Sequence, residues 1–190
     1  MIYLVDAFNL IYKFPELEEH MARGQLPEAM NGITELLAQY KQSRESATNK
    51  PRSAKPGGGK SKTRRRQIAT ELHLFFDGKR KRGDETRRST HAGMQLYYSQ
   101  DLSADHLIRE FIGRHPTPAD ITVVSTDKQI REFARLHKCK RVLSEEFAEA
   151  VLGAIEEKEG QQEGERMGDE AVAKPSDPDT DYWLEQFRQR

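Results

Sequence analysis

Cysteine is nearly absent from this chain, with Cys139 the single example among 190 residues. A lone thiol excludes an intramolecular disulfide and a thiolate cluster for zinc. A small residue beside a strand is a far commoner role for such a cysteine than a nucleophile. The six histidines show no ligand spacing and are most simply surface or packing residues. The sequence therefore argues against a disulfide scaffold and against a zinc site.

Long apolar runs are also missing. The first run ends at Asp6 after five residues, and no run approaches the roughly 18 residues that a membrane span requires. The N-terminus has no basic start of the kind that signal peptides carry. We therefore expect a soluble, cytoplasmic protein without a membrane partner, and a monomer is the favoured oligomeric state.

The chain has no net charge, but its charges are strongly separated. Residues 41–88 hold 16 Lys and Arg against 5 Asp and Glu, a net charge of +11, whereas residues 145–190 have a net charge of −9. Only 35% of the residues are hydrophobic and 33% are charged, which predicts substantial solvated segments. The basic middle indicates a polyanionic partner.

Strand-like and helix-like segments alternate along the chain. Four strands are predicted at residues 2–5, 72–76, 94–99 and 121–124, and a short fifth within "KRVLSEEF". Helices are predicted from Pro27 to Tyr40, in "SADHLIREFIGRH" with Ser103 as N-cap, in "KQIREFARLHKC", and over 145–157. "KRKRGDETRRSTHAG" is interpreted as a basic loop. This order predicts an α/β fold with three layers, in which helices cover both faces of a mainly parallel sheet of about five strands.

The predicted domain covers residues 1–157 and contains a flexible basic insertion at about 43–70. An acidic flexible linker is predicted over 158–180. The end of the chain, 181–190, is predicted to form a short helix with Trp183 and Phe187 on it. Docking of this helix on its own domain and docking on a partner both remain open.

Aspartates follow three of the predicted strands. Asp6, Asp77 and Asp127 each stand at a carboxyl end, where open parallel sheets bind their ligands. A fourth carboxylate, Asp105, lies in the first turn of a predicted helix, beside its apolar stripe. Each acid alone has a simpler interpretation as a turn residue, an N-cap or a first-turn acid. Their convergence on one edge favours a hard cation such as Mg²⁺ or Mn²⁺, with basic loops that bind a phosphate backbone.

Three ordered stretches carry a family resemblance. "YLVDAFNLI", "MQLYYSQDLSADHLIREFI" and "ITVVSTDKQIREFARLHKCKRVLSEEF" resemble the strand-one, (T/S)AD-helix and VVTSD segments of the YacP-like NYN domain family, which belongs to the PIN-like nuclease superfamily. The resemblance covers residues 1–150 apart from the basic insertion. Strand one departs from the usual "DGYN", because Ala7 stands where glycine is more common.

The resemblance implies a PIN-like (NYN) fold and a metal-dependent endoribonuclease with Mg²⁺ or Mn²⁺ as cofactor. RNA is the implied substrate, and the ribosome is a further implied partner. By position, Asp6, Asp105 and Asp127 would be the catalytic, metal-binding acids, and Asp77 would complete the metal pocket. The implied substrate-binding residues are Asn9, Ser125 and Thr126, together with the basic residues Lys79, Arg80, Lys81, Arg82, Arg64, Arg65 and Arg66.

Two other functions fit parts of the same sequence. A catalytically inactive RNA- or ribosome-binding module would need only the basic loops. A phosphatase or nucleotide-binding protein is the weaker alternative, since "GGGKSKT" at 57–63 lacks the full spacing of a phosphate-binding loop and does not follow a predicted strand. Loss of cleavage with retained RNA affinity in acid-to-amide variants separates the nuclease from the binding module.

Overall fold

The fold was analysed in a computed structural model that describes residues 1–49, 70–78, 86–99 and 102–170. The chain forms two units, Met1–Ile155 and Glu156–Arg190. All of the elements that position the candidate site lie in the first unit. The predicted terminal helix at 181–190 lies outside the described residues.

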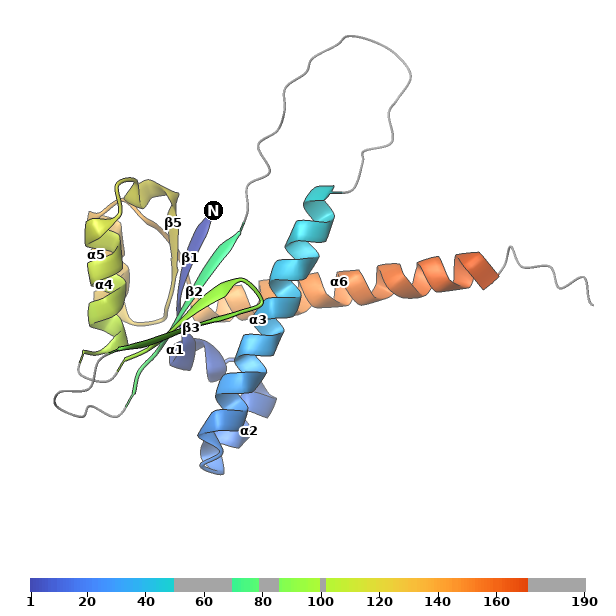
Figure 1. The fold of residues 1–190 in the computed structure, drawn as a ribbon, viewed down its shortest axis with the longest axis horizontal. Coiled ribbons are helices and arrows are strands. Elements are labelled where there is room, and N and C mark those ends of the chain that lie inside the picture. The colour runs from blue at the N-terminus through green and yellow to red at the C-terminus, as the bar shows by residue number, and fades with distance from the viewer. Residues whose placement is uncertain (50–69, 79–85, 100–101, 171–190) are drawn as a thin grey trace, which may run out of the picture. The chain divides into compact units, whose positions relative to one another are not determined.

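A six-stranded sheet forms the centre of the first unit, in the order β3-β4-β2-β1-β5-β6 (Figure 1). All neighbouring strands run parallel except β3, which pairs antiparallel with β4. The three central strands are almost wholly buried and apolar, as expected for strands that are covered on both faces. The strands are β1 Ile2–Asp6, β2 Glu71–Phe76, β3 Arg87–His91, β4 Met94–Tyr98, β5 Ile121–Val124 and β6 Lys140–Val142.

Helices cover both faces of the sheet (Figure 1). One apolar core contains side chains of α1, α2, α3 and the first turns of α6, and the other contains side chains of α4 and α5. Together these layers form the α/β/α arrangement that the alternating sequence predicts. The helices are α1 Ala7–Ile11, α2 Pro15–Ala22, α3 Leu26–Asn49, α4 Ala104–Arg114, α5 Lys128–Leu136 and α6 Ser144–Glu170, with a short 3₁₀ turn, η1, at Pro118–Asp120.

The strand order places a switch point between β1 and β5. The chain leaves β1 through helices on one face and reaches β2, whereas it leaves β5 through α5 on the other face and reaches β6. In open α/β sheets, such a reversal opens a crevice outside the carboxyl ends of the two strands. Asp6 ends β1 and Asp127 follows β5, so the two acids flank this crevice.

Several predicted elements are confirmed, one predicted loop contains a strand, and two helices extend beyond their predicted ends. The strand at 121–124 and the helix capped by Ser103 occur as predicted. Part of the predicted second basic loop is instead strand β3, whose residues are all exposed. Helix α3 continues to Asn49, into the predicted insertion, and α6 continues to Glu170, into the predicted linker. Both extensions are polar but rich in residues of good helix propensity, which need no apolar stripe to continue a helix.

No helix within the described ranges is long and apolar enough to cross a bilayer.

The N-cap of α4 offers a first test of the fold. The hydroxyl of Ser103 accepts a hydrogen bond of 3.2 Å from the backbone N–H of His106. Ser103→Ala is expected to lower the free energy of unfolding by about 1 kcal/mol, or the melting temperature by about 2–4 °C. Thermal denaturation followed by circular dichroism measures this, and Ser103→Asp is the control that retains a capping oxygen. Equal melting temperatures for Ser103→Ala and the natural protein would contradict the assignment.

Candidate active site

Asp6 stands where β1 passes directly into α1. Its carboxylate caps the helix, and Oδ1 accepts a hydrogen bond of 3.3 Å from the backbone N–H of Asn9. The side-chain amide of Asn9 donates to Oδ2 of the same carboxylate. Asp6 is only 8% exposed. Burial raises the pKa of Asp6 and the charge of Asp105 adds to this, although the bonds from Asn9 and Ser125 act in the opposite direction.

Ser125 connects the ends of β1 and β5. It is fully buried, and its hydroxyl donates to Oδ2 of Asp6 at 3.2 Å. The hydroxyl oxygen of Ser125 also accepts hydrogen bonds from the side-chain amide of Asn9 at 3.3 Å and from the backbone N–H of Asp127 at 3.0 Å. One donor and two acceptor positions are thereby used, which is the full capacity of a hydroxyl. Ser125 therefore fixes Asp6 and the turn before α5 relative to each other.

Asp127 is the N-cap of α5. Its Oδ1 accepts hydrogen bonds from the backbone N–H groups of Gln129, at 2.7 Å, and of Ile130, at 2.9 Å. Within the described residues, its second oxygen, Oδ2, has no hydrogen-bond partner. Asp127 is half-buried. One oxygen thus orients the side chain while the other is left for a ligand.

Asp105 lies in the first turn of α4, the end of the helix that meets the carboxyl edge of the sheet. Its half-buried carboxylate makes no hydrogen bond or ion pair with the described part of the chain. Burial and the nearby carboxylates of Asp127 and Asp77 raise the pKa of Asp105, and the guanidinium of Arg109 acts against them. An acid with repelling neighbours and no partner is costly in the folded state unless a cation compensates it.

Asp77 follows β2 and is exposed. Its Oδ1 accepts hydrogen bonds from the hydroxyl of Ser99, at 3.0 Å, and from the backbone N–H of Ala104, at 3.3 Å. The buried Ser99 also accepts a hydrogen bond of 3.1 Å from the backbone N–H of Gly78. Asp77 therefore connects the end of β2 to the first residue of α4, directly beside Asp105.

Four acids from four different elements thus gather at one edge of the sheet. The charge of Asp105 raises the pKa of Asp6, and the charges of Asp127 and Asp77 raise the pKa of Asp105. No group of three His, Cys, Asp or Glu side chains in the described ranges is close enough to hold a metal ion by itself. Mg²⁺ commonly keeps several waters and takes only one or two carboxylates. The unpartnered oxygens of Asp105 and Asp127 fit a hydrated divalent cation of this kind.

The remaining predicted site residues divide into two groups. Thr126 donates its hydroxyl to Glu145 at 3.2 Å, and Glu145 also pairs with Lys13 at 2.6 Å, so Thr126 bonds away from the four acids. The predicted basic residues Lys79, Arg80, Lys81, Arg82, Arg64, Arg65 and Arg66 lie outside the described residues.

The structure explains how position 7 accommodates alanine where glycine is more common in the family. Ala7 is the first residue of α1 and is fully buried. Its φ angle is not positive, unlike those of Ala92 and Lys138. The backbone at Ala7 therefore does not require the conformational freedom of glycine.

Sequence reasoning missed Ser99 and the pair formed by Lys13 and Glu145. Ser99 is a small polar residue at the carboxyl end of a strand, the same signal that marks Asp77 and Asp127, so it was detectable. The contact of Lys13 with Glu145 joins segments far apart in the sequence and leaves no local pattern.

Comparison with known proteins identifies the family of the chain and supports its fold. The family model "YacP-like NYN domain" matches residues 63–189, more than half of the chain, and this match includes Asp77, Asp105 and Asp127. No curated protein matches. The fold is similar to the crystal structure of Rae1 (YacP) from Bacillus subtilis, with a TM-score of 0.57 and 17% identity over 99% of this chain and 94% of that one. A tryptophan-to-leucine mutant of that protein gives a TM-score of 0.58 and 15% identity over 95% of this chain and 89% of that one.

The family match and the six-stranded α/β/α fold lead to the same assignment. NYN domains are PIN-like nuclease domains, so a nuclease type of activity on RNA is indicated. The chain belongs to the YacP-like NYN domain family.

Proposed function

We propose that this protein is a metal-dependent endoribonuclease whose active site is the acidic edge formed by Asp6, Asp77, Asp105 and Asp127. The observation that carries the proposal is Asp105, a half-buried carboxylate without a partner in the described residues, whose pKa is raised by burial and by two neighbouring acids. A fold tolerates such a group where a ligand compensates its charge. PIN-like NYN nucleases generally depend on a divalent metal, and the oxygen ligands here suit Mg²⁺ or Mn²⁺.

The residues of the chain have distinct roles in this proposal. Asp105 and the Oδ2 atom of Asp127 would hold the cation. The hydrogen bonds from Asn9 and Ser125 orient Asp6 at the switch point and favour its ionised form against the effect of burial. When bound, the cation would neutralise charge on the scissile phosphate and lower the pKa of a bound water. Asp77 keeps the start of α4, and with it Asp105, at the edge. The basic residues at 64–66 and 79–82 are proposed to bind the phosphate backbone without reading sequence.

An inactive RNA- or ribosome-binding module is the second candidate, and one observation favours it. Both oxygens of Asp6 already accept hydrogen bonds from the chain itself, which leaves them fewer positions for a ligand. This candidate predicts RNA binding that weakens steeply with salt and needs no metal. The ribosome, with its translated messenger RNA, is the proposed location of the bound RNA in either case.

Removal of the metal is the direct test. The full-length protein is incubated with a single-stranded RNA labelled at its 5′ end, in Mn²⁺ or Mg²⁺, and the products are separated on a denaturing gel. We expect internal cleavage that stops in EDTA and returns when Mn²⁺ is added in excess. Asp127→Asn is the matched variant, because asparagine is an equally good N-cap and only the charge is lost. Cleavage that continues in EDTA, or at an unchanged rate in Asp127→Asn, would contradict the proposal, and salt-sensitive binding without cleavage would favour the binding module.

A further inference from the structure

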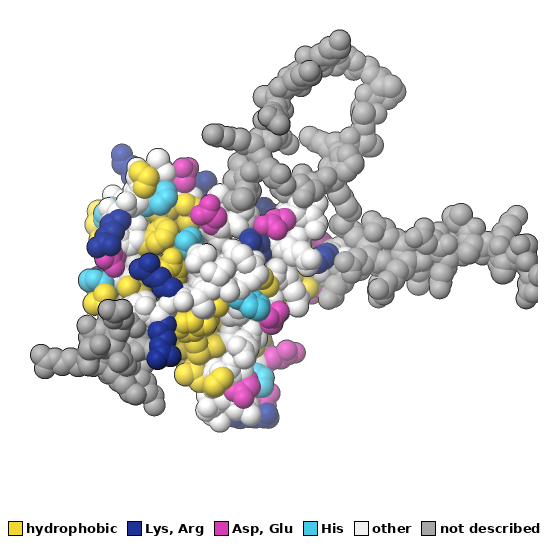
Figure 2. All heavy atoms as spheres, viewed as in Figure 1, with side chains coloured by type: hydrophobic (Ala, Val, Ile, Leu, Met, Phe, Trp, Pro, Cys, Tyr) yellow, Lys and Arg dark blue, Asp and Glu magenta, His cyan; other side chains and the backbone are white. Residues whose placement is uncertain are grey.

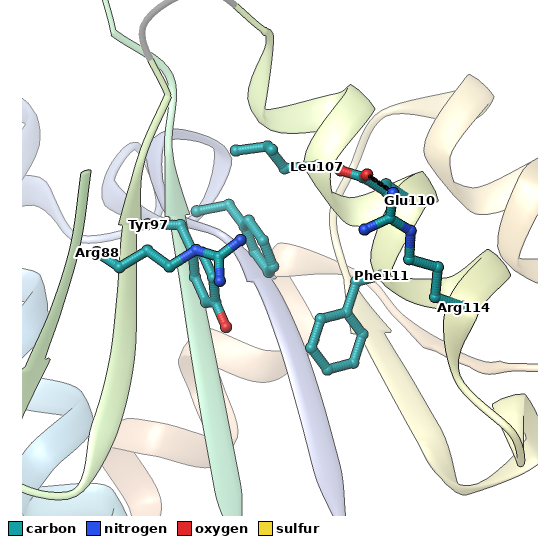
Figure 3. A pocket seen from close by; sticks show the side chains of 7 residues that line it. Arg88, Tyr97, Leu107, Glu110, Phe111 and Arg114 are labelled. Atoms are coloured by element: carbon teal, nitrogen blue, oxygen red, sulfur yellow. Dashed lines mark ion pairs between the residues drawn. The ribbon is translucent and has the colours of Figure 1, made fainter. Parts of the chain in front are cut away.

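A hollow of about 170 Å³ lies between the sheet and α4 (Figure 3). It is about half the size of the smallest pockets that bind drug-sized ligands, which begin near 300 Å³. A space of this size suits one flat ring system. We call it the ring pocket, and its lining consists of Phe75, Arg88, Tyr97, Leu107, Glu110, Phe111 and Arg114.

Tyr97 is the centre of the sheet side of the ring pocket. It pairs with Phe75 across β2 and β4, and their rings stack 4.6 Å apart at 11°. Tyr97 is also the register partner of Arg88 on the neighbouring strand β3. The guanidinium carbon of Arg88 lies 5.5 Å from the centroid of the Tyr97 ring. Figure 3 shows this guanidinium in front of the ring. One face of Tyr97 is therefore covered by a ring and the other by a flat cation.

The side chain of Arg88 is free to leave its position over the Tyr97 ring. Its side chain is exposed, and it makes no ion pair with any residue in the described ranges. A guanidinium over an aromatic face is held only weakly at an exposed site, so the contact restrains this long side chain little. A planar ligand can take its place on the ring at little cost.

The α4 side of the pocket supplies another ring and a charged rim. Phe111 is half-buried and points into the gap between helix and sheet (Figure 3). Arg114 pairs with Glu110 at 2.6 Å, and the Arg114 side chain is 80% exposed. On the face seen in Figure 2, Lys and Arg side chains border a strip of apolar side chains. An aromatic gap with arginines at its mouth is the combination that proteins use to stack the bases of single-stranded nucleic acid.

We propose that the ring pocket binds one unpaired base of the RNA substrate, which stacks on Tyr97 in the position of the Arg88 guanidinium. The displaced Arg88 then contacts the phosphate of the same nucleotide, as a guanidinium does well. This inference rests on the proposed function and deepens it, because it defines the substrate as RNA with an unpaired base near the cleavage site.

The location of the ring pocket supports this use. Phe75 lies two residues before Asp77, and Leu107 lies two residues after Asp105. From Asp105 to Phe111 the helix rises by about 9 Å. A base in the ring pocket therefore belongs to a nucleotide close to the phosphate at the acidic edge, and stacking there would position that phosphate.

The test measures binding separately from cleavage. Full-length protein carrying Asp127→Asn is titrated, in EDTA, into a short single-stranded RNA that contains one 2-aminopurine, whose fluorescence falls when it stacks. We expect quenching on binding, and an abasic nucleotide at that position is expected to weaken affinity about fivefold or more. Tyr97→Leu and Phe111→Leu should each weaken the binding of the base-containing RNA by a similar factor, whereas Tyr97→Phe keeps the ring and should retain both affinity and quenching.

A second aromatic residue provides the matched control. Phe133 of α5 is also half-buried beneath an arginine, with the guanidinium carbon of Arg109 5.8 Å from its ring centroid, but it lies outside the ring pocket. Phe133→Leu is expected to leave affinity and quenching unchanged. Equal affinity for base-containing and abasic RNA, or an equal loss in Phe133→Leu and Phe111→Leu, would overturn the inference. Quenching that persists in a protein without cleavage supports the ring pocket while contradicting the proposed nuclease, so the two failures are distinguishable.

Discussion

Asp105→Asn is expected to lower the rate of RNA cleavage by about 100-fold or more, because a ligand worth several kcal/mol of charge stabilisation is lost. The carboxylate of Asp105 has no partner in the described residues, so no internal hydrogen bond is broken by the change. Asparagine has the same shape and keeps the first turn of α4. The loss of activity can therefore be attributed to the charge, which is not true of Asp6, whose two oxygens hold the end of β1 in place.

The same variant is expected to be more stable than the natural protein at neutral pH. The pKa of Asp105 is raised in the folded state by burial and by the charges of Asp127 and Asp77, so its ionised form costs free energy of folding. This cost is complete above the folded pKa and disappears as the pH falls below the ordinary value of 3.8. The stability advantage of Asp105→Asn should thus narrow steadily as the pH is lowered.

Thermal melting at pH 7.5 and at pH 4.5, together with the gel assay, measures both effects. Added Mn²⁺ should raise the melting temperature of the natural protein and should raise that of Asp105→Asn less. Asp120→Asn, at an exposed acid of η1 outside both the acidic edge and the ring pocket, is the control for a general effect of removing a negative charge. If Asp105→Asn cleaved RNA at the natural rate, Asp105 would have no role in the chemistry. If it melted below the natural protein at pH 7.5, the electrostatic account of the site would be wrong.

Gly78→Ala is expected to produce the second large effect, a loss of stability of about 1–3 kcal/mol together with a loss of activity of about 100-fold. A Cβ atom at Gly78 would lie 2.0 Å from the backbone oxygen of Ser99. Since this oxygen belongs to the backbone, no change of rotamer relieves the overlap. Hydrogen bonds join the two segments on both sides, from Gly78 N–H to the Ser99 hydroxyl and from Ser99 N–H to the Phe76 oxygen.

Activity should fall with stability because the displaced segments hold the acids. Ser99 donates to Asp77, and Asp77 accepts from the first N–H of α4. A shift between β2 and β4 therefore moves Asp105 relative to Asp6. Gly113→Ala is the matched control, since nothing lies within 4 Å of a Cβ at that helical position, and it should raise stability by about 0.5–1 kcal/mol. Retained activity and stability in Gly78→Ala would show that the contact with Ser99 is not maintained in solution.

The sequence predicts the parts of the fold that depend on local pattern. Every residue of the run at 121–124 is β-branched and three of the four are apolar, and the structure has strand β5 at these residues. By contrast, β3 is missed because all five of its residues are exposed and no alternation marks them. Only its pairing with β4 makes it a strand, and this information lies in another segment.

For the candidate site, the sequence predicts which acids share one edge of the sheet but not the hydrogen bonds that they make. Strand ends and topology place Asp6, Asp77 and Asp127 on one edge without any coordinates. The hydrogen bonds that distinguish them do not follow from pattern, because they depend on distances between segments far apart in the sequence. This is why the hydrogen bond from Thr126 to Glu145 could not be predicted from the sequence, and why only the structure identifies Asp105 as a cleaner position than Asp6 for testing the chemistry.

The contact between Ser125 and Asp6 spans 119 positions of the chain, and this separation has a consequence for biosynthesis. The first acid of the site leaves the ribosome early, whereas β5 and the cap of α5 follow only after most of the domain has been made. Until then the nascent chain has the carboxylates of β1 and β2 without the opposing strand that completes the edge. A site built in this way can be complete only after β5 has been synthesised and has joined the sheet.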